Sequence, residues 1–167
     1  MTVRPGAERT GPGEGSPTTL EEVSHLFARV IASPGAVRLA LRTSRRPRNP
    51  WRQGACLVLA GAVVRWLGQD GAEVWELAGE HVLVKVGGLV IDGGGIAPVN
   101  EMLKVWAGDG GLGDCAVDGM HRSSLAEAER KGYEFDDWAS ERLAALLSKA
   151  IPRDAALEAM SSCGQPR

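Results

Sequence analysis

Cys56, His81 and Asp92 follow one another along the middle of the chain and supply a thiol, an imidazole and a carboxylate. A cysteine attacks as its thiolate, so it needs a nearby base to take its proton. An imidazole needs a hydrogen-bond partner that fixes its tautomer and supports its positive charge. The three residue types therefore predict a nucleophile, its base and the group that orients the base, provided that the fold brings them together.

Cys56 opens an apolar run over 55–67 that ends at Gly68, which is typical of a buried helix. The N–H groups and dipole at a helix start favour an anion by roughly 0.3–1 kcal/mol, which is too little to ionise a thiol. A neighbouring imidazolium does more, because a cysteine paired with histidine can have a pKa of about 3–4. The backbone N–H of Cys56 and the side chain of Gln53, in the loop before it, are predicted to stabilise an oxyanion.

His81 and Asp92 belong to a predicted hairpin. His81 begins a strand over 81–86, Asp92 ends a strand over 89–92, and two glycines separate the strands. A two-residue loop pairs Val86 with Leu89, which places His81 and Asp92 on the same face as diagonal neighbours about 7 Å apart. Their side chains are then within reach of a hydrogen bond, whereas a slip of one residue would put them on opposite faces.

The rest of the chain predicts an α+β fold in which N-terminal helices and the cysteine-bearing helix pack on a small antiparallel sheet. Residues 1–17 are rich in Gly, Pro and charge and are expected to be a disordered tail. Residues 18–152 are predicted to form a single catalytic-type domain, and 153–167 a C-terminal helix and tail. Besides 55–67, helices are predicted over 20–31, where Thr19 and Glu22 form a capping box, and over 98–106, 123–131, 137–150 and 154–161. The segment 37–42 is ambiguous, and a helix is favoured there. Further strands are expected at 72–77 and, within a Gly/Asp-rich loop, at 115–117.

Composition limits the classes of function. The net charge of -2 argues against nucleic-acid binding, and no uncharged apolar run approaches the roughly 20 residues that span a bilayer. Three cysteines and the absence of an apolar signal segment favour a cytoplasmic protein with no membrane partner. Asp114, Cys115 and His121 were considered as metal ligands, but no Cys or His pair has the spacing of a zinc site. Neither a metal nor an organic cofactor is expected.

Gly54, Cys56 and Ala60 form a Gly-x-Cys-x-x-x-Ala element that opens a helix, and a His-led strand and an Asp-ended strand follow it. This stretch, 53–96, resembles the papain-like superfamily of thiol enzymes, and most of all its transglutaminase-like branch. The order of the three residues is also similar to that of arylamine N-acetyltransferases, whose aspartate precedes a glycine-rich turn. The chain departs from the transglutaminase-like pattern where that pattern has aromatic residues beside the cysteine and histidine, and here has Leu57, Val82 and Leu83.

The resemblance and the residues together predict a cysteine-dependent hydrolase, a peptidase or amidase that acts on a peptide or protein substrate. The Cys56 thiolate would form an acyl-enzyme, which water resolves. A thiol acyltransferase, in which an amine resolves the acyl-enzyme, is the first alternative.

A non-catalytic binding module of the same fold is the second alternative. In that case Cys56 is a packing residue, and the arginine-rich loop Arg42–Arg52 binds an acidic partner. A solvated loop explains the arginines more simply. Trp51, at the end of this loop, is predicted to lie beside the site, because it is so close to Cys56 in the sequence.

Overall fold

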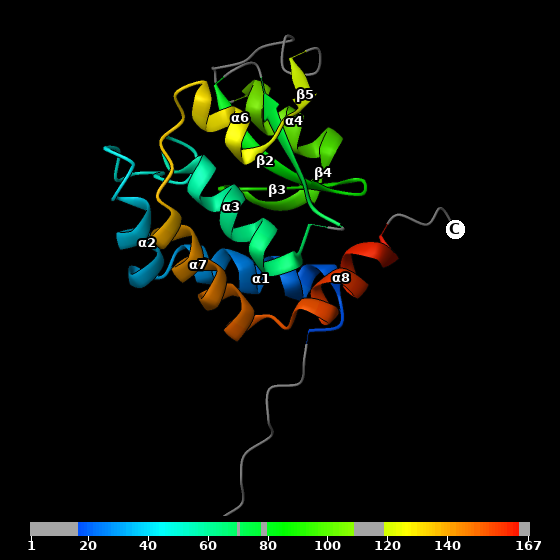
Figure 1. Cartoon of the computed structure of the whole chain (residues 1–167). Coiled ribbons are helices and arrows are strands. Elements are labelled where there is room, and N and C mark those ends of the chain that lie inside the picture. The colour runs from blue at the N-terminus through cyan, green and yellow to red at the C-terminus, as the bar shows by residue number, and fades with distance from the viewer. Residues whose placement is uncertain (1–16, 70, 78–79, 109–118, 164–167) are drawn as a thin grey trace, which may run out of the picture.

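The computed structural model describes residues 17–69, 71–77, 80–108 and 119–163 (Figure 1). The predicted strand at 115–117, the candidate ligands Asp114 and Cys115, and all but one residue of the predicted tail lie outside these ranges. None of the helices within the described ranges has the length and apolar character needed to cross a membrane.

The described residues form an α+β fold around an antiparallel sheet with the strand order β4-β3-β2-β1-β5. The strands are β1 (Glu73–Leu77), β2 (His81–Val86), β3 (Leu89–Asp92), β4 (Gly95–Pro98) and β5 (Met120–Arg122). The helices are α1 (Leu20–Ile31), α2 (Pro34–Ala40), α3 (Cys56–Leu67), α4 (Val99–Gly108), α6 (Leu125–Arg130), α7 (Asp137–Ala150) and α8 (Arg153–Ser162). The sequence-based prediction of helices packed on a small antiparallel sheet is confirmed at this level.

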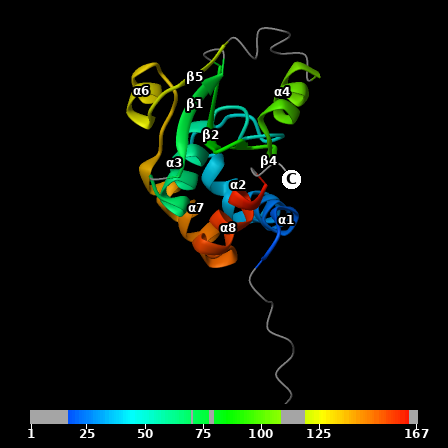
Figure 2. The same cartoon turned by 90° about the vertical axis from the view of Figure 1, so that its right-hand side faces the viewer.

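The sheet carries a helix on each face. Figure 2 shows α3 on one side of β1 and β2 and α4 on the other. On the first face, α3 packs against β2 and is itself covered by α7. Eleven of the twelve residues of α3 are buried, which explains why its sequence is apolar all round.

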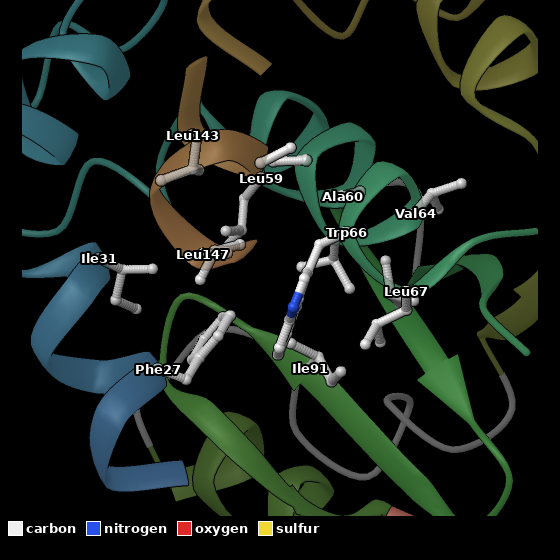
Figure 3. Packing of buried hydrophobic residues seen from close by; sticks show 14 of the residues in the cluster. Phe27, Ile31, Leu59, Ala60, Val64, Trp66, Leu67, Ile91, Leu143 and Leu147 are labelled. Carbon is white, nitrogen blue, oxygen red and sulfur yellow. The ribbon is translucent and has the colours of Figure 1, made fainter. Parts of the chain in front are cut away.

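Trp66 lies at the centre of the main hydrophobic core. It reaches from α3 towards Ile91 of the sheet, and Phe27 of α1 stacks on it with the ring centroids 6.2 Å apart (Figure 3). Its indole N–H donates to the carbonyl of Ile151 at 3.0 Å, so the polar atom of this buried ring is satisfied. The Trp66 side chain thereby joins the sheet, α1 and the segment between α7 and α8.

Local signals explain most helix ends. Thr19 and Glu22 form the predicted capping box of α1. The ambiguous segment is helical, but it begins earlier than predicted, because Ser33 caps the helix and Pro34 takes the first helical position. The prediction that Pro98 begins a helix is wrong: Pro98 ends β4, paired with Leu89, and α4 begins at Val99. A proline is tolerated there because β4 is an edge strand.

The register of the central hairpin decides where the candidate residues point. Val86 pairs with Leu89 and Val84 with Ile91, as predicted from the two-residue loop. Val82, Val84 and Ile91 belong to the core under α3, whereas Leu83 and Val90 pack with Met102 of α4. By the alternation of a strand, His81 and Asp92 share the α4 face with Leu83 and Val90.

Candidate functional site

His81 and Asp92 meet through their side chains. Nε2 of His81 lies 3.2 Å from Oδ2 of Asp92, and each residue is 1% exposed. The other carboxylate oxygen of Asp92 accepts the backbone N–H of Gly94 at 2.6 Å. The turn after β3 therefore holds the carboxylate in place, and the carboxylate holds the imidazole.

Cys56 reaches the same imidazole from the start of α3. Burial alone would lower the pKa of His81, but the hydrogen bond to Asp92 and the interaction with the Cys56 thiol outweigh it, so the pKa is raised. Because Nε2 faces Asp92, Nδ1 is the ring nitrogen that remains for the thiol. Nδ1 is buried and makes no hydrogen bond of standard geometry in the described part of the chain. The imidazole of His81 thus interacts with both of the other residues predicted from the sequence, the Asp92 carboxylate and the Cys56 thiol.

The backbone before Cys56 forms a tight turn that fixes the start of α3. Gly54 has a φ of +111°, and a Cβ there would lie 3.1 Å from the Cα of Ser44. Ala55, at the N-cap, provides no side-chain cap for the first turn of the helix. The N–H groups and dipole of α3 therefore favour negative charge at Cys56 without competition from a capping side chain.

Trp106 and Arg52 cover the imidazole on the α4 side of the sheet. The ring centroids of His81 and Trp106 are 4.1 Å apart at an interplanar angle of 37°, and the Arg52 guanidinium lies 4.1 Å from the Trp106 ring centroid. Nε of Arg52 is also 3.7 Å from Oδ2 of Asp92. This stack keeps water from His81 and places a fixed positive charge beside the carboxylate. No pattern in the sequence predicts this role for either residue, because both reach the site through the packing of elements distant in sequence from His81.

Trp51, predicted to lie beside the site, packs against the turn that follows Asp92. It is 3% exposed, belongs to the hydrophobic core, and donates its indole N–H to the carbonyl of Ile31 at 2.8 Å. A Cβ at Gly93 would lie only 2.7 Å from the Cβ of Trp51 and 2.8 Å from Cγ of Arg52. Trp51 therefore anchors the loop that carries Arg52, while Trp106 is the tryptophan in contact with the candidate base.

Cys56 opens into a pocket of about 260 Å³. Its lining includes Glu80, Tyr133, Glu134 and Arg45, besides Thr43, Gly54 and Gly132. The hydroxyl of Tyr133 is buried and has no hydrogen-bond partner within the described residues. Burial raises the pKa of Tyr133 to about 12, with further contributions from the charges of Cys56, Glu76 and Glu80. Tyr133 therefore stays protonated and keeps an unused donor, in a residue that lines the same pocket as Cys56.

The end of α6 holds Tyr133 in this place. Nζ of Lys131 lies 3.1 Å from both carboxylate oxygens of Glu76, a buried residue of β1. Burial would raise the pKa of Glu76, but hydrogen bonds from Ser123 and Lys131 lower it overall. This ion pair fixes the segment that carries Tyr133 to the sheet.

The Gln53 side chain and the arginines of the arginine-rich loop lie at different positions in the structure. The Gln53 side chain is exposed and does not line the pocket, while its carbonyl accepts the Ser44 hydroxyl. The loop does not present one arginine cluster: Arg42 pairs with Asp136, Arg45 lines the Cys56 pocket, and Arg52 lies at Asp92. A donor role for Gln53 stays a prediction.

Within the described ranges, no group of three or more His, Cys, Asp or Glu side chains is arranged to hold a metal ion. His121, considered as a ligand from the sequence, lies with its Nε2 3.8 Å from Glu76.

No family model, curated protein or solved structure matches the chain.

Proposed function

We propose that this protein is a cysteine-dependent hydrolase of the peptidase or amidase type, with Cys56, His81 and Asp92 as its catalytic residues. The observation that carries the proposal is the buried imidazole of His81, which interacts with the Asp92 carboxylate through Nε2 and also interacts with the Cys56 thiol. The resemblance to papain-like and transglutaminase-like enzymes adds support, because the cysteine begins a helix and the other two residues come from adjacent strands.

The reaction begins with transfer of the Cys56 proton to Nδ1 of His81, while Asp92 supports the resulting imidazolium. The sulfur attacks the carbonyl carbon of an amide, and the C–N bond then breaks as His81 returns the proton to the leaving amine. The product is a thioester between Cys56 and the acyl group. Water, deprotonated by His81, hydrolyses the thioester and restores the thiol.

Tyr133 supplies a donor for the oxyanion that forms when the sulfur attacks. Tyr133 is one of the residues that line the pocket at Cys56, its buried hydroxyl has no hydrogen-bond partner in the described part of the chain, and its raised pKa keeps it protonated. The N–H groups at the start of α3 are the second source of donors. Both are in place before substrate binds, which is the condition for effective stabilisation of developing charge.

Acyl transfer to an amine is the second candidate function. Glu80 and Glu134 are exposed and line the same pocket as Cys56. Carboxylates at this position attract a protonated amine, and such an amine can resolve the thioester in place of water after losing its proton to His81. The two functions share the first half of the reaction and differ in the acceptor.

The test is formation of an acyl-enzyme with a p-nitrophenyl ester of a short acyl group, read as p-nitrophenol release and as the mass increase of the intact protein. We expect wild type and Cys163→Ala to gain one acyl group and Cys56→Ala to gain none. Acylation that persists in Cys56→Ala would contradict the proposal. Addition of a primary amine separates the candidates, since a transferase forms the amide product and a hydrolase forms the acid.

A further inference from the structure

The N-terminal helices α1 and α2 are in contact with α7 (Figure 1). A second concave surface lies between these helices and α7. It consists of a cavity of about 540 Å³ between α2 and α7 and one of about 420 Å³ between α1 and α7. The two share Leu146 and Lys149 and so form one continuous groove, called here the α7 groove. It does not include any residue of the Cys56 pocket.

The α7 groove is lined by cations and contains no acidic side chain in its lining. Its basic residues come from both walls: Arg29, Arg38, Arg42, Arg142 and Lys149. Of these, Arg42 is paired with Asp136, whereas the described part of the chain contains no ion pair to the other four. Such a concentration of positive charge stands out on a chain whose net charge is -2.

The floor of the groove is apolar and partly exposed. Trp138 is 50% exposed and lies between two guanidinium groups, those of Arg42 at 4.9 Å and Arg142 at 5.4 Å from its ring centroid. Leu146 is exposed as well, and Leu26, Leu39 and Val30 continue the apolar surface. On α7 the lining residues Trp138, Arg142, Ala145 and Lys149 recur at helical spacing and form one stripe.

We propose that the α7 groove binds an acidic amphipathic helix of a partner protein. Apolar side chains at i, i+3, i+4 and i+7 of such a helix would pack on Trp138 and Leu146, and its Asp and Glu residues would pair with the cations on both walls. A single-stranded nucleic acid stacks successive bases on several aromatic side chains. Trp138 is the one aromatic residue in the lining of the α7 groove, and the rest of the floor is aliphatic, which favours the helix as occupant. The surface shares only Arg42 with the arginine-rich loop Arg42–Arg52, and the proposal is independent of the chemistry at Cys56.

The test is selection of a displayed library of random 16-residue peptides on the whole wild-type chain, followed by anisotropy with the enriched peptide. The groove variant is Arg142→Glu, and the matched control is Arg130→Glu, which reverses an exposed charge on α6. We expect acidic peptides with Leu or Trp at helical spacing. Their affinity should fall at least tenfold in Arg142→Glu and Trp138→Ala and less than twofold in Arg130→Glu.

Three outcomes would overturn the proposal. One is enrichment of peptides without acidic residues, or of none at all. The second is equal affinity for the groove and control variants. The third is tighter binding of a single-stranded oligo-dT, or dimerisation of the chain that Arg142→Glu abolishes, either of which assigns the groove to another occupant. Circular dichroism of each variant verifies that it is folded.

Discussion

At the residue scale, the candidate base interacts with two side chains of the same chain, a carboxylate and a thiol. His81 is nearly fully buried, so a charged imidazole there depends on Asp92 and on the thiolate. Loss of either partner leaves burial as the dominant influence, and burial lowers the pKa of a histidine. The reactivity of Cys56 and the ionisation of His81 are therefore linked properties of one unit.

This linkage predicts a pH dependence of stability. Because the pKa of His81 is raised in the folded state above its ordinary value of 6.5, its contribution to stability is full below pH 6.5 and is lost as the pH rises through the folded-state pKa. The slope is at most about 1.4 kcal/mol per pH unit. Denaturant unfolding of wild type and Asp92→Asn between pH 5 and 9 measures it. We expect the difference in unfolding free energy between the two proteins to shrink over this range, and a constant difference would contradict the assignment.

Tyr133→Phe tests the oxyanion donor. The substitution removes only the unpartnered hydroxyl, so the fold should be unchanged. Acylation by the p-nitrophenyl ester should slow by about 10–1,000-fold, the range expected for loss of an oxyanion donor. Alkylation of Cys56 by iodoacetamide forms no oxyanion and should change less than about twofold. Equal slowing of both reactions would show that Tyr133 acts on the thiol itself and not on the oxyanion.

At the element scale, the site depends on how closely the loop before α3 approaches the turn after β3. Gly93 permits this approach, because any Cβ there would collide with Trp51 and with the backbone N of Arg52. Gly93→Ala should therefore cost about 1–3 kcal/mol, the range for an overpacked interior. Gly88→Ala is the control, since a Cβ at Gly88 meets nothing within 4 Å. Thermal unfolding of both variants measures the difference, and a Gly93→Ala protein as stable as the control would refute this packing role.

The elements also show which features can be predicted from a sequence. The helix start at Cys56 and the pairing of Val86 with Leu89 follow from local signals, namely an apolar run and a two-glycine turn. β4 was not predicted because its sequence, Gly95–Pro98, contains two residues that strands disfavour, and only pairing with β3 makes it a strand. β5 was not predicted either, because it also depends on pairing, in this case with β1, which lies far away in the sequence.

The candidate site, too, could be predicted from the sequence only where its contacts follow from local signals. His81 and Asp92 are joined by a short hairpin, so their proximity follows from register alone. The approach of Trp106, Arg52 and Tyr133 depends on long-range packing of α4, the loop before α3 and the end of α6. No periodicity or spacing in the sequence encodes those contacts.

At the scale of the whole molecule, two chain segments contribute to both concave surfaces. Arg42 lines the α7 groove, and the next residue, Thr43, lines the Cys56 pocket. In the second segment, Glu134 lines the Cys56 pocket and Trp138 lines the α7 groove. The Cys56 pocket and the α7 groove are thus lined by residues that are close together in the sequence, although no residue lines both. A partner bound in the groove would lie next to the segments that shape the pocket.

His81 is expected to make a buried thiol reactive, whereas burial alone predicts the opposite. Cys56 is 5% exposed, whereas Cys163 is exposed on the surface. The most direct measurement is the rate of iodoacetamide alkylation at each cysteine at pH 7, followed by peptide mass spectrometry in wild type and His81→Gln. We predict that Cys56 reacts at least tenfold faster than Cys163 in wild type and more slowly than Cys163 in His81→Gln. Faster alkylation of Cys163 in the wild-type protein would contradict the account.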